Sequence, residues 1–218
     1  QIVKRRKVVT NIRKITKTMQ LIATARFQSA FNRAMRTKPY TQRITQLVEE
    51  LSSAAEGQMD HPLLRENPEA EKDLLLVITS NRGLCGGYNA NVLRRTIAHL
   101  EEHASRPHEI EVVGKKGVGY LRFLGRDIRR AITNIDDRPR FEQVEPLASE
   151  YMDRYTAGEL GSVYVVHMRF ITASKQVPEV VRLLPLSGAP SRKPAKDAGA
   201  ERPIEALYDF SPPPAQLL

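Results

Sequence analysis

The 218-residue sequence has no tryptophan, a single cysteine and few aromatic residues, which make up 6 % of the chain. The lone Cys85 excludes an internal disulfide framework and fits a reducing compartment or indifference to redox conditions. The longest aliphatic runs, such as residues 74–78, are too short to cross a bilayer, so direct membrane insertion is not expected. No apolar signal region is present, although the chain opens on Gln1 rather than Met, which leaves a processed start open.

Acidic residues are absent before Glu49, and glycine is absent before Gly57. The same stretch holds 12 of the 34 Lys and Arg residues and one proline, Pro39. These features predict one very long basic helix over residues 1–56, which Pro39 kinks or divides into two segments. At 1.5 Å per residue such a helix would be roughly 80 Å long, more than a domain of this size can bury, so we expect it to project.

The formal net charge of +9 is concentrated in this segment, because the rest of the chain sets 22 basic residues against all 25 acidic ones, a net of −3. Such asymmetry predicts an acidic or polyanionic partner: a nucleic acid, an anionic membrane surface or an acidic protein socket. Arg5, Arg6 and Lys7 could contact phosphates, but without interleaved aromatic residues any nucleic-acid binding would be nonspecific. A membrane-surface helix would carry more Trp and Leu on its apolar side.

A narrow apolar stripe runs along the predicted helix. Its first members follow a 4-3-4-3 spacing and its later ones are shifted by one position: Val8, Ile12, Ile15, Met19, Ile22, then Ala23, Phe27, Ala30 and Ala34. A stripe that is narrow and flanked by charge suits a seam against one partner helix. The alternative is a solvated helix with a basic outer face.

The remainder of the chain alternates predicted strands and helices. A linker over 57–72 leads into a domain over 73–187, followed by a flexible loop over 188–206 and a short final segment over 207–218. Strands are predicted at 74–78, 110–113, 163–171 and 180–186, and helices at 89–103, 115–124 and 141–157. The alternation predicts an α/β fold, a Rossmann-like mixed sheet whose last two strands form an antiparallel hairpin.

Three patterns imitate catalytic or metal-binding motifs. The loop 82–87 follows a strand and precedes a helix, yet it lacks the glycine spacing of a dinucleotide site and the lysine of a Walker motif. His99–His103 matches the H-x-x-E-H zinc pattern, but it is expected at the polar end of a surface helix without a third ligand. Asp136 and Asp137 are adjacent and diverge, and no base is nominated for Cys85. No catalytic, cofactor or metal site is therefore predicted.

Two stretches resemble signatures of one known family. Residues 9–23, VTNIRKITKTMQLIA, are similar to the amino-terminal helix signature of the gamma subunit of rotary F-type ATP synthases. Residues 80–91, SNRGLCGGYNAN, resemble the second signature of that family, in which a strand ends in an Asp-Arg-Gly-Leu-Cys-Gly loop. The likeness covers nearly the whole chain, and both signatures occur in the family's order.

The resemblance implies a noncatalytic central-stalk rotor that couples ion flow to conformational change at catalytic sites on beta subunits. Its implied partners are the alpha and beta subunits, the epsilon (or delta-type) subunit and the c-subunit ring, without nucleic acid or cofactor, at the periphery of an energy-coupling membrane. Carried over by position, the residues that would contact the alpha/beta ring are Ile12, Arg13, Ile15, Lys17, Met19, Ile22 and Arg26. Those of the foot loop and its partner contacts are Arg82, Gly83, Leu84, Cys85, Gly86 and Tyr208.

Two departures from the family pattern affect these expectations. Asn81 stands where the family has Asp, which puts in doubt any salt bridge made there. The family also ends in a second long helix that pairs with the first as an antiparallel coiled coil. Residues 207–218 are expected to lead into that helix, which would continue beyond Leu218.

Overall fold

The computed structural model describes residues 1–54 and 61–186. The chain divides into two compact units, Gln1–Glu50 and Leu51–Leu218. The predicted loop over 188–206 and the predicted final segment over 207–218, with Tyr208, lie outside the described residues.

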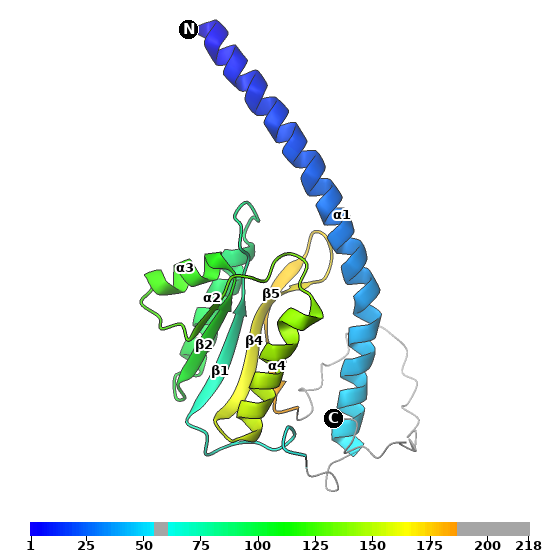
Figure 1. Cartoon of the computed structure of the whole chain (residues 1–218), viewed down its shortest axis with the longest axis vertical. Coiled ribbons are helices and arrows are strands. Elements are labelled where there is room, and N and C mark those ends of the chain that lie inside the picture. Colours follow the sequence, from blue (N-terminus) through cyan, green and yellow to red (C-terminus); the bar gives the residue numbers. More distant parts are fainter. Residues whose placement is uncertain (55–60, 187–218) are drawn as a thin grey trace. The chain divides into compact units, whose positions relative to one another are not determined.

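The first unit is built from α1, a single α-helix of 53 residues that spans Ile2–Ala54 (Figure 1). This confirms the predicted long helix. The helix assignment is continuous across Pro39, so the predicted start of a new segment at that residue is wrong. A proline inside a helix removes one hydrogen bond of the ladder, and a helix of this length retains the others on either side.

The second unit contains a five-stranded sheet in the order β3-β2-β1-β4-β5. The strands are β1 (Lys72–Ile78), β2 (His108–Val113), β3 (Arg130–Ile132), β4 (Leu160–Phe170) and β5 (Gln176–Leu184). The first four strands are mutually parallel, and β5 runs antiparallel to β4. The predicted mixed sheet with a terminal hairpin is therefore confirmed.

Helices cover both faces of this sheet: α2 (Tyr88–Glu102) and α3 (Lys115–Phe123) on one side and α4 (Phe141–Thr156) on the other (Figure 1). The central strand β1 supplies both cores because successive side chains of a strand point to opposite faces. Leu75 and Val77 pack with residues of α2 and α3, whereas Leu74 packs with Tyr151 and Tyr155 of α4. All five are at most 4 % exposed, as a continuous apolar strand between two helical layers requires.

The strand boundaries differ from the predicted ones by a few residues, and the two largest differences are at β3 and β5. The three-residue β3 was not predicted, because two of the residues around it, Arg129 and Arg130, are charged and the strand is too short to show a period. β5 begins at Gln176 rather than at residue 180 and includes Pro178, which was placed in the connection. A proline is tolerated there because β5 is the last strand of the sheet order.

The described part of the predicted linker, residues 61–71, packs against the sheet domain. Leu63 is 7 % exposed and joins the core on the α4 side. The Tyr155 hydroxyl donates to the Arg65 carbonyl at 2.5 Å, and the Asn67 amide donates to the carbonyls of Tyr155 and Leu160 at 2.8 and 3.0 Å. These bonds attach the segment to the end of α4.

A close approach fixes the start of α3 against the end of β1. Gly114 precedes α3 with φ +96°, and a Cβ at this position would collide with the Thr79 carbonyl. The Thr79 hydroxyl donates to the Val113 carbonyl at 2.7 Å and accepts from the Gly117 amide at 3.0 Å. Glycine is required at position 114 by both the backbone angle and the available space.

Candidate functional site

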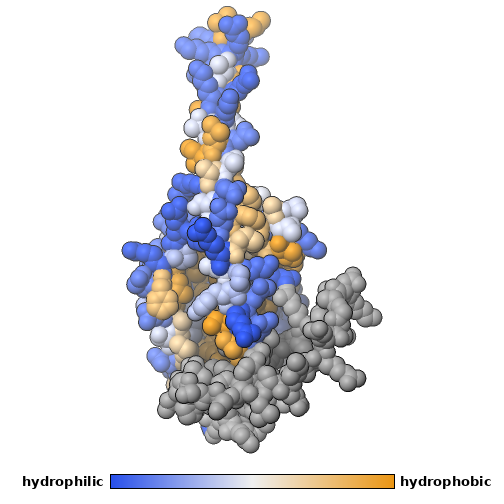
Figure 2. Space-filling model, turned by 90° about the vertical axis from the view of Figure 1, so that its right-hand side faces the viewer, coloured by the Kyte–Doolittle hydropathy of each residue, from blue (hydrophilic) through white to orange (hydrophobic). Residues whose placement is uncertain are grey.

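The apolar stripe of α1 is exposed along its whole predicted length. Val8, Ile12, Ile15, Met19, Ile22 and Phe27 have exposed fractions between 48 % and 60 %. In the space-filling view, hydrophobic patches alternate with hydrophilic ones along this helix (Figure 2). Since large apolar side chains gathered on one face are costly to leave in water, the stripe is a candidate surface for a protein partner.

The threonine hydroxyls of α1 donate to the backbone of their own helix. All seven, from Thr10 to Thr45, donate to the carbonyl four residues earlier at 2.9–3.2 Å. Each hydroxyl hydrogen is thus already bonded within the helix. The surface of α1 therefore offers methyl groups and long basic side chains, and no threonine donor is directed outward.

No acidic residue precedes Glu49, so the basic side chains of this stretch cannot form ion pairs with acids of the same stretch. Arg13, Lys17 and Arg26, which were predicted as contacts, lie on exposed positions of α1. Side chains three or four residues apart lie on one helical face, so Arg13 and Lys17 are neighbours of the stripe residues. Arg13 and Lys17 therefore place positive charge beside the apolar stripe.

The predicted foot loop follows β1 and projects its side chains into solvent. Leu84 is 95 % exposed, and its φ of +62° lies in the left-handed region that residues other than glycine rarely adopt. Gly86 shares this region with φ +59°. An exposed leucine held in an unfavourable backbone conformation is typical of a residue that serves contact rather than folding.

Side-chain hydrogen bonds hold the loop in this shape. The Asn89 carbonyl oxygen accepts from the Ser80 amide at 3.0 Å, and the Asn89 amide donates to the Ser80 hydroxyl at 2.9 Å and to the Cys85 sulfur at 3.1 Å. The Ser80 hydroxyl donates in turn to the Arg82 carbonyl at 2.6 Å. Arg82, Gly83 and Gly86 are themselves exposed, as is the free Cys85.

Asn81 connects this loop to two others at the same edge of the sheet. Its side-chain amide donates to the carbonyls of Thr133 and Ile135 at 3.4 and 2.9 Å, and its carbonyl oxygen accepts from the Lys115 amide at 3.1 Å. An Asp at this position could accept from Lys115 but could not donate to the other two carbonyls. The departure from the family pattern is thus accommodated by neutral hydrogen bonds.

An ionic network around the buried Glu111, which joins β2, the start of β3 and α4, was not predicted from the sequence. Glu111 of β2 is fully buried and pairs with Arg129, and the Tyr151 hydroxyl donates to it at 2.7 Å. Arg130 pairs with Glu150 at 2.6 Å, and Arg129 also bonds Glu150 at 3.0 Å. Burial, followed by the bond to Glu111, raises the pKa of Tyr151. The sequence pattern that could have predicted this network is the pair Glu109 and Glu111, two acids at alternate positions of one strand.

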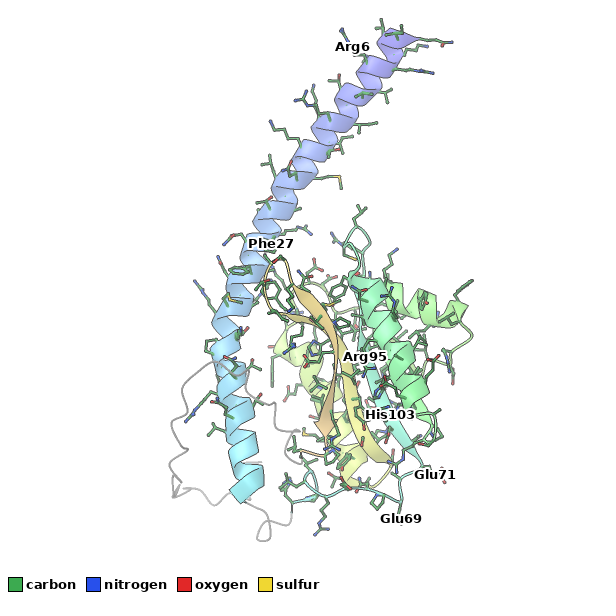
Figure 3. The ribbon with its side chains drawn as sticks, turned by 180° about the vertical axis from the view of Figure 1, so that it is seen from behind. Arg6, Phe27, Glu69, Glu71, Arg95 and His103 are labelled. Atoms are coloured by element: carbon green, nitrogen blue, oxygen red, sulfur yellow. The ribbon has the colours of Figure 1, made fainter. Side chains whose placement is uncertain are left out.

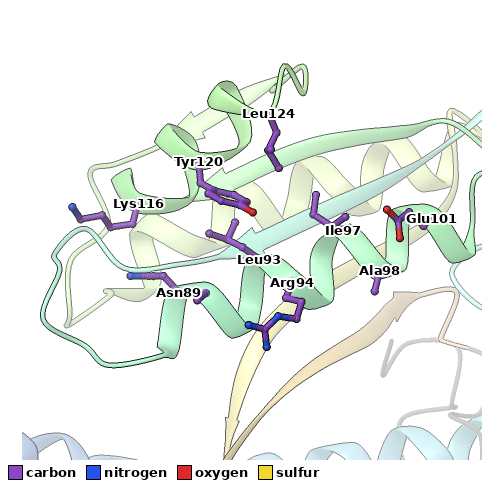
Figure 4. Close-up of a pocket in the computed structure, with 10 residues that line it drawn as sticks. Asn89, Leu93, Arg94, Ile97, Ala98, Glu101, Lys116, Tyr120 and Leu124 are labelled. Carbon is purple, nitrogen blue, oxygen red and sulfur yellow. The ribbon is translucent and has the colours of Figure 1, made fainter.

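A groove of about 720 Å³ lies between α2 and α3 (Figure 4). Leu93 and Ile97 of α2 face Tyr120 and Leu124 across it, and Arg94, Glu101 and Lys116 supply its charges. None of its lining residues is a serine, cysteine or histidine, so this groove holds no serine or cysteine nucleophile paired with a histidine base.

The predicted site residues thus fall into two groups. Seven lie on α1 and five lie on the loop after β1, while Tyr208 lies outside the described residues. Within the described residues no helix is both long and apolar enough to span a membrane.

Comparisons with known proteins agree with the two signatures. A family model described as ATP synthase matches residues 1–218. The ATP synthase gamma chain of Rhodopirellula baltica is 38 % identical over 217 residues, which cover 99 % of this chain and 73 % of that protein. The gamma chain of Leptospira biflexa is 36 % identical over 214 residues, covering 97 % and 72 %.

A solved structure shares the fold. The central stalk and c-ring of the mitochondrial ATP synthase of Tetrahymena thermophila contains a chain with TM-score 0.63 and 23 % identity, over 78 % of this chain and 72 % of that one. From the family match over residues 1–218 and the identities above 30 %, it follows that the chain belongs to the ATP synthase gamma chain family.

Proposed function

We propose that this chain is the central-stalk rotor subunit of a membrane-bound ATP synthase, coupling ion-driven rotation to conformational change at catalytic sites on beta subunits. The observation that carries the proposal is the match to gamma chains over almost the whole sequence, together with an exposed α1 that has no acidic residue before Glu49. The family assignment favours this function over a basic arm for nucleic acid.

The surface of α1 suits a shaft that turns inside a socket of alpha and beta subunits. Ile12, Ile15, Met19 and Ile22 provide shallow apolar contact, and Arg13, Lys17 and Arg26 provide long-range attraction to acidic segments of the socket. Because the threonine hydroxyl hydrogens are bonded within the helix, the shaft makes few fixed donor contacts that would have to break at each step.

The loop 82–86 is proposed as the contact of the foot with the c-subunit ring or the epsilon subunit. Its support is local: Leu84 is almost fully exposed, and the hydrogen bonds of Asn89 and Asn81 hold the loop rigidly at one edge of the sheet. A rigid, exposed loop can transmit a force because it does not have to be ordered on binding.

The chain itself is proposed to be noncatalytic, with ATP bound and converted on the beta subunits. Two of its described polar clusters serve structure: Glu111 is bonded to Arg129, Arg130 and Tyr151, and the hydrogen bonds of Asn81 are neutral. No cofactor is proposed. The chain would be peripheral to the energy-coupling membrane through its partners.

Co-expression with alpha and beta subunits of a close relative tests the proposal. We expect a stable complex whose ATPase rate depends on this chain. The double variant Arg13→Glu/Lys17→Glu should lower the ATPase rate of this complex at least about tenfold. Reversing two attractions of about 1 kcal/mol each weakens the contact with the socket by up to about 4 kcal/mol, and about 1.4 kcal/mol is enough for a tenfold effect.

The matched control is Arg94→Glu, a reversal on an exposed position of the sheet domain, which should leave ATPase unchanged. If alpha and beta subunits form equally active complexes with and without this chain, the proposed function is wrong. For the foot loop, Leu84→Asp should leave ATPase of the soluble complex intact and reduce its attachment to membranes that contain the c-subunit ring.

A further inference from the structure

Three of the five histidines of the chain gather at the end of α2 and the start of β2. The ring centroids of His99 and His103 are 4.2 Å apart, and those of His99 and His108 are 5.4 Å apart. Tyr164 of β4 closes the cluster with its ring 4.8 Å from that of His99. His99 lies near the end of a helix with an exposed face, as expected, but its own exposed fraction is only 2 %, which was not predicted.

Buried ring nitrogens in this cluster have no hydrogen-bond partner. Within the described part of the chain, His99 Nε2 and His108 Nε2 are both buried and unpartnered. A buried polar atom without a partner is costly, and few such atoms occur in native proteins. His99 therefore presents an unsatisfied nitrogen next to other groups that bind metals.

The second histidine is fixed in the tautomer that a metal ligand needs. His103 Nδ1 lies 3.0 Å from the His99 carbonyl oxygen. A carbonyl can only accept, so Nδ1 carries the hydrogen and the lone pair of the neutral ring is on Nε2. Metal-binding histidines usually have this arrangement, in which a backbone carbonyl orients the ring.

Glu102 supplies a third ligand that was not recognised from the sequence. One ligand atom each from His99, Glu102 and His103 all lie within 4.8 Å of one another. Around a tetrahedral Zn²⁺ with bonds of about 2.0–2.1 Å, ligand atoms are about 3.4 Å apart, so the three atoms must draw closer, chiefly by movement of the exposed Glu102 side chain. The three residues are spaced i, i+3, i+4 on one helical face.

We propose that His99, Glu102 and His103 form a binding site for a divalent transition metal such as Zn²⁺, Co²⁺ or Ni²⁺. Imidazole nitrogen with one carboxylate is the donor set that these ions prefer. The site is at the last turn of α2, where the carbonyl ends of the helix favour a cation. Figure 3 shows the position of His103 at this end of α2.

Two further features bear on the ion. In favour of the ion, His99 Nε2 has no hydrogen-bond partner among the described residues, so no bond of that atom has to break when it coordinates. Arg95 competes with the ion for Glu102, because its Nη1 donates to both carboxylate oxygens at 3.0 Å. The metal must displace this guanidinium from at least one oxygen.

Titration of the tag-free, metal-stripped 218-residue chain with Co²⁺ tests the site. We expect saturable one-to-one binding with the visible absorption bands of a four-coordinate ion, displaced by Zn²⁺, and a rise in Tm with Zn²⁺ that EDTA reverses. Binding that does not saturate, or that leaves Tm unchanged, would overturn the proposal.

Variants distinguish this site from scattered surface binding. His103→Ala and Glu102→Gln should each weaken Co²⁺ binding at least about tenfold, as loss of even an outer partner does in known sites. Both positions are outside the buried core, so the variants should fold with the circular dichroism of the parent. His61→Ala and His167→Ala, which remove the other two histidines, should bind Co²⁺ as the parent does; equal losses in all four variants would refute the assignment.

Removal of the competing cation provides a gain-of-function test. Arg95→Ala frees both Glu102 oxygens and should tighten Co²⁺ binding several-fold. Arg94→Ala is the control, because it removes the same charge from the preceding residue. Arg94 Nη1 donates to Asn91 at 3.4 Å rather than to Glu102, so this variant should have a smaller effect. If the two variants bind Co²⁺ identically to the parent, Glu102 is not a ligand.

Discussion

The two units of this chain are stabilised in different ways. The described side chains of α1 are almost all exposed, and no acidic residue balances its charge before Glu49. In the sheet domain, apolar side chains fill both faces of β1, and even a glutamate, Glu111, is fully buried with its partners. The difference teaches that most side chains of α1 contribute little buried surface to the chain itself, whereas those of the sheet domain hold its own fold.

The largest effect on folding is expected at Glu111. Glu111→Ala leaves Arg129, Arg130 and the Tyr151 hydroxyl without their shared acceptor, which should lower the free energy of unfolding by about 3 kcal/mol. The estimate is at the low end for a broken buried pair because both arginines are about one-third exposed. Urea unfolding followed by circular dichroism measures the change.

Glu145→Ala, on an exposed position of α4, is the matched control and should change stability by less than about 0.5 kcal/mol. Equal costs for the two variants would mean that the buried network does not stabilise the sheet domain.

A smaller loss is expected at Gly114. Gly114→Ala forces a Cβ into the Thr79 carbonyl at a φ of +96°, so we expect a loss of about 2 kcal/mol. Gly119→Ala is the control inside α3, where a Cβ would meet nothing within 4 Å, and it should stabilise by up to about 1 kcal/mol. A lower Tm for Gly114→Ala and a higher Tm for Gly119→Ala would confirm that close packing at position 114 leaves no room for a side chain. Changes in Tm of the same sign would contradict this.

Acid should weaken the sheet domain through Glu150. The hydrogen bond from Arg130 lowers the pKa of Glu150, against burial, and Arg129 adds to the effect. A carboxyl with a lowered pKa in the folded state stabilises fully above its unfolded pKa, about 4.3, and loses this contribution as the pH falls through the folded pKa. The free energy of unfolding of the parent should therefore be about 1 kcal/mol higher than that of Glu150→Gln at pH 7. This difference should shrink below about pH 4.3.

Unfolding titrations of both proteins between pH 7 and pH 3 give this difference directly. Comparison with Glu150→Gln removes the contributions of other groups, such as His99, because they are common to both proteins. If the difference in free energy of unfolding between the two proteins grows as the pH falls, the pairing of Glu150 with Arg130 does not stabilise the fold as proposed.

The sequence predicted the elements whose pattern is long or strongly apolar. The absence of glycine and acids predicted α1, and the unbroken run 74–78 predicted the central strand with its two covered faces. The loop 82–86 was located from its signature, but the positive φ of Leu84 was not, because a leucine gives no local sign of that conformation.

Contacts between distant segments could not be predicted in the same way. β3 is defined by its pairing with β2, and His108 reaches His99 only because β2 returns beside α2. The Glu111 network joins three elements, and each charge alone is typical of a solvated position. Such clusters depend on the topology of the sheet, which a pattern along one segment does not contain.

The smallest effect on folding is expected on the stripe of α1, and it tests the comparison most directly. Ile15 is 60 % exposed, so Ile15→Ala should change the free energy of unfolding by less than about 0.5 kcal/mol. Ile110→Ala makes the same truncation at a 6 % exposed position of β2 and should cost about 2–4 kcal/mol. In a complex with alpha and beta subunits, Ile15→Ala should have the larger effect of the two on the ATPase rate. That loss of rate should be greater than its small effect on stability can explain. An Ile15→Ala variant that unfolds as readily as Ile110→Ala would show that α1 is stabilised by burial after all.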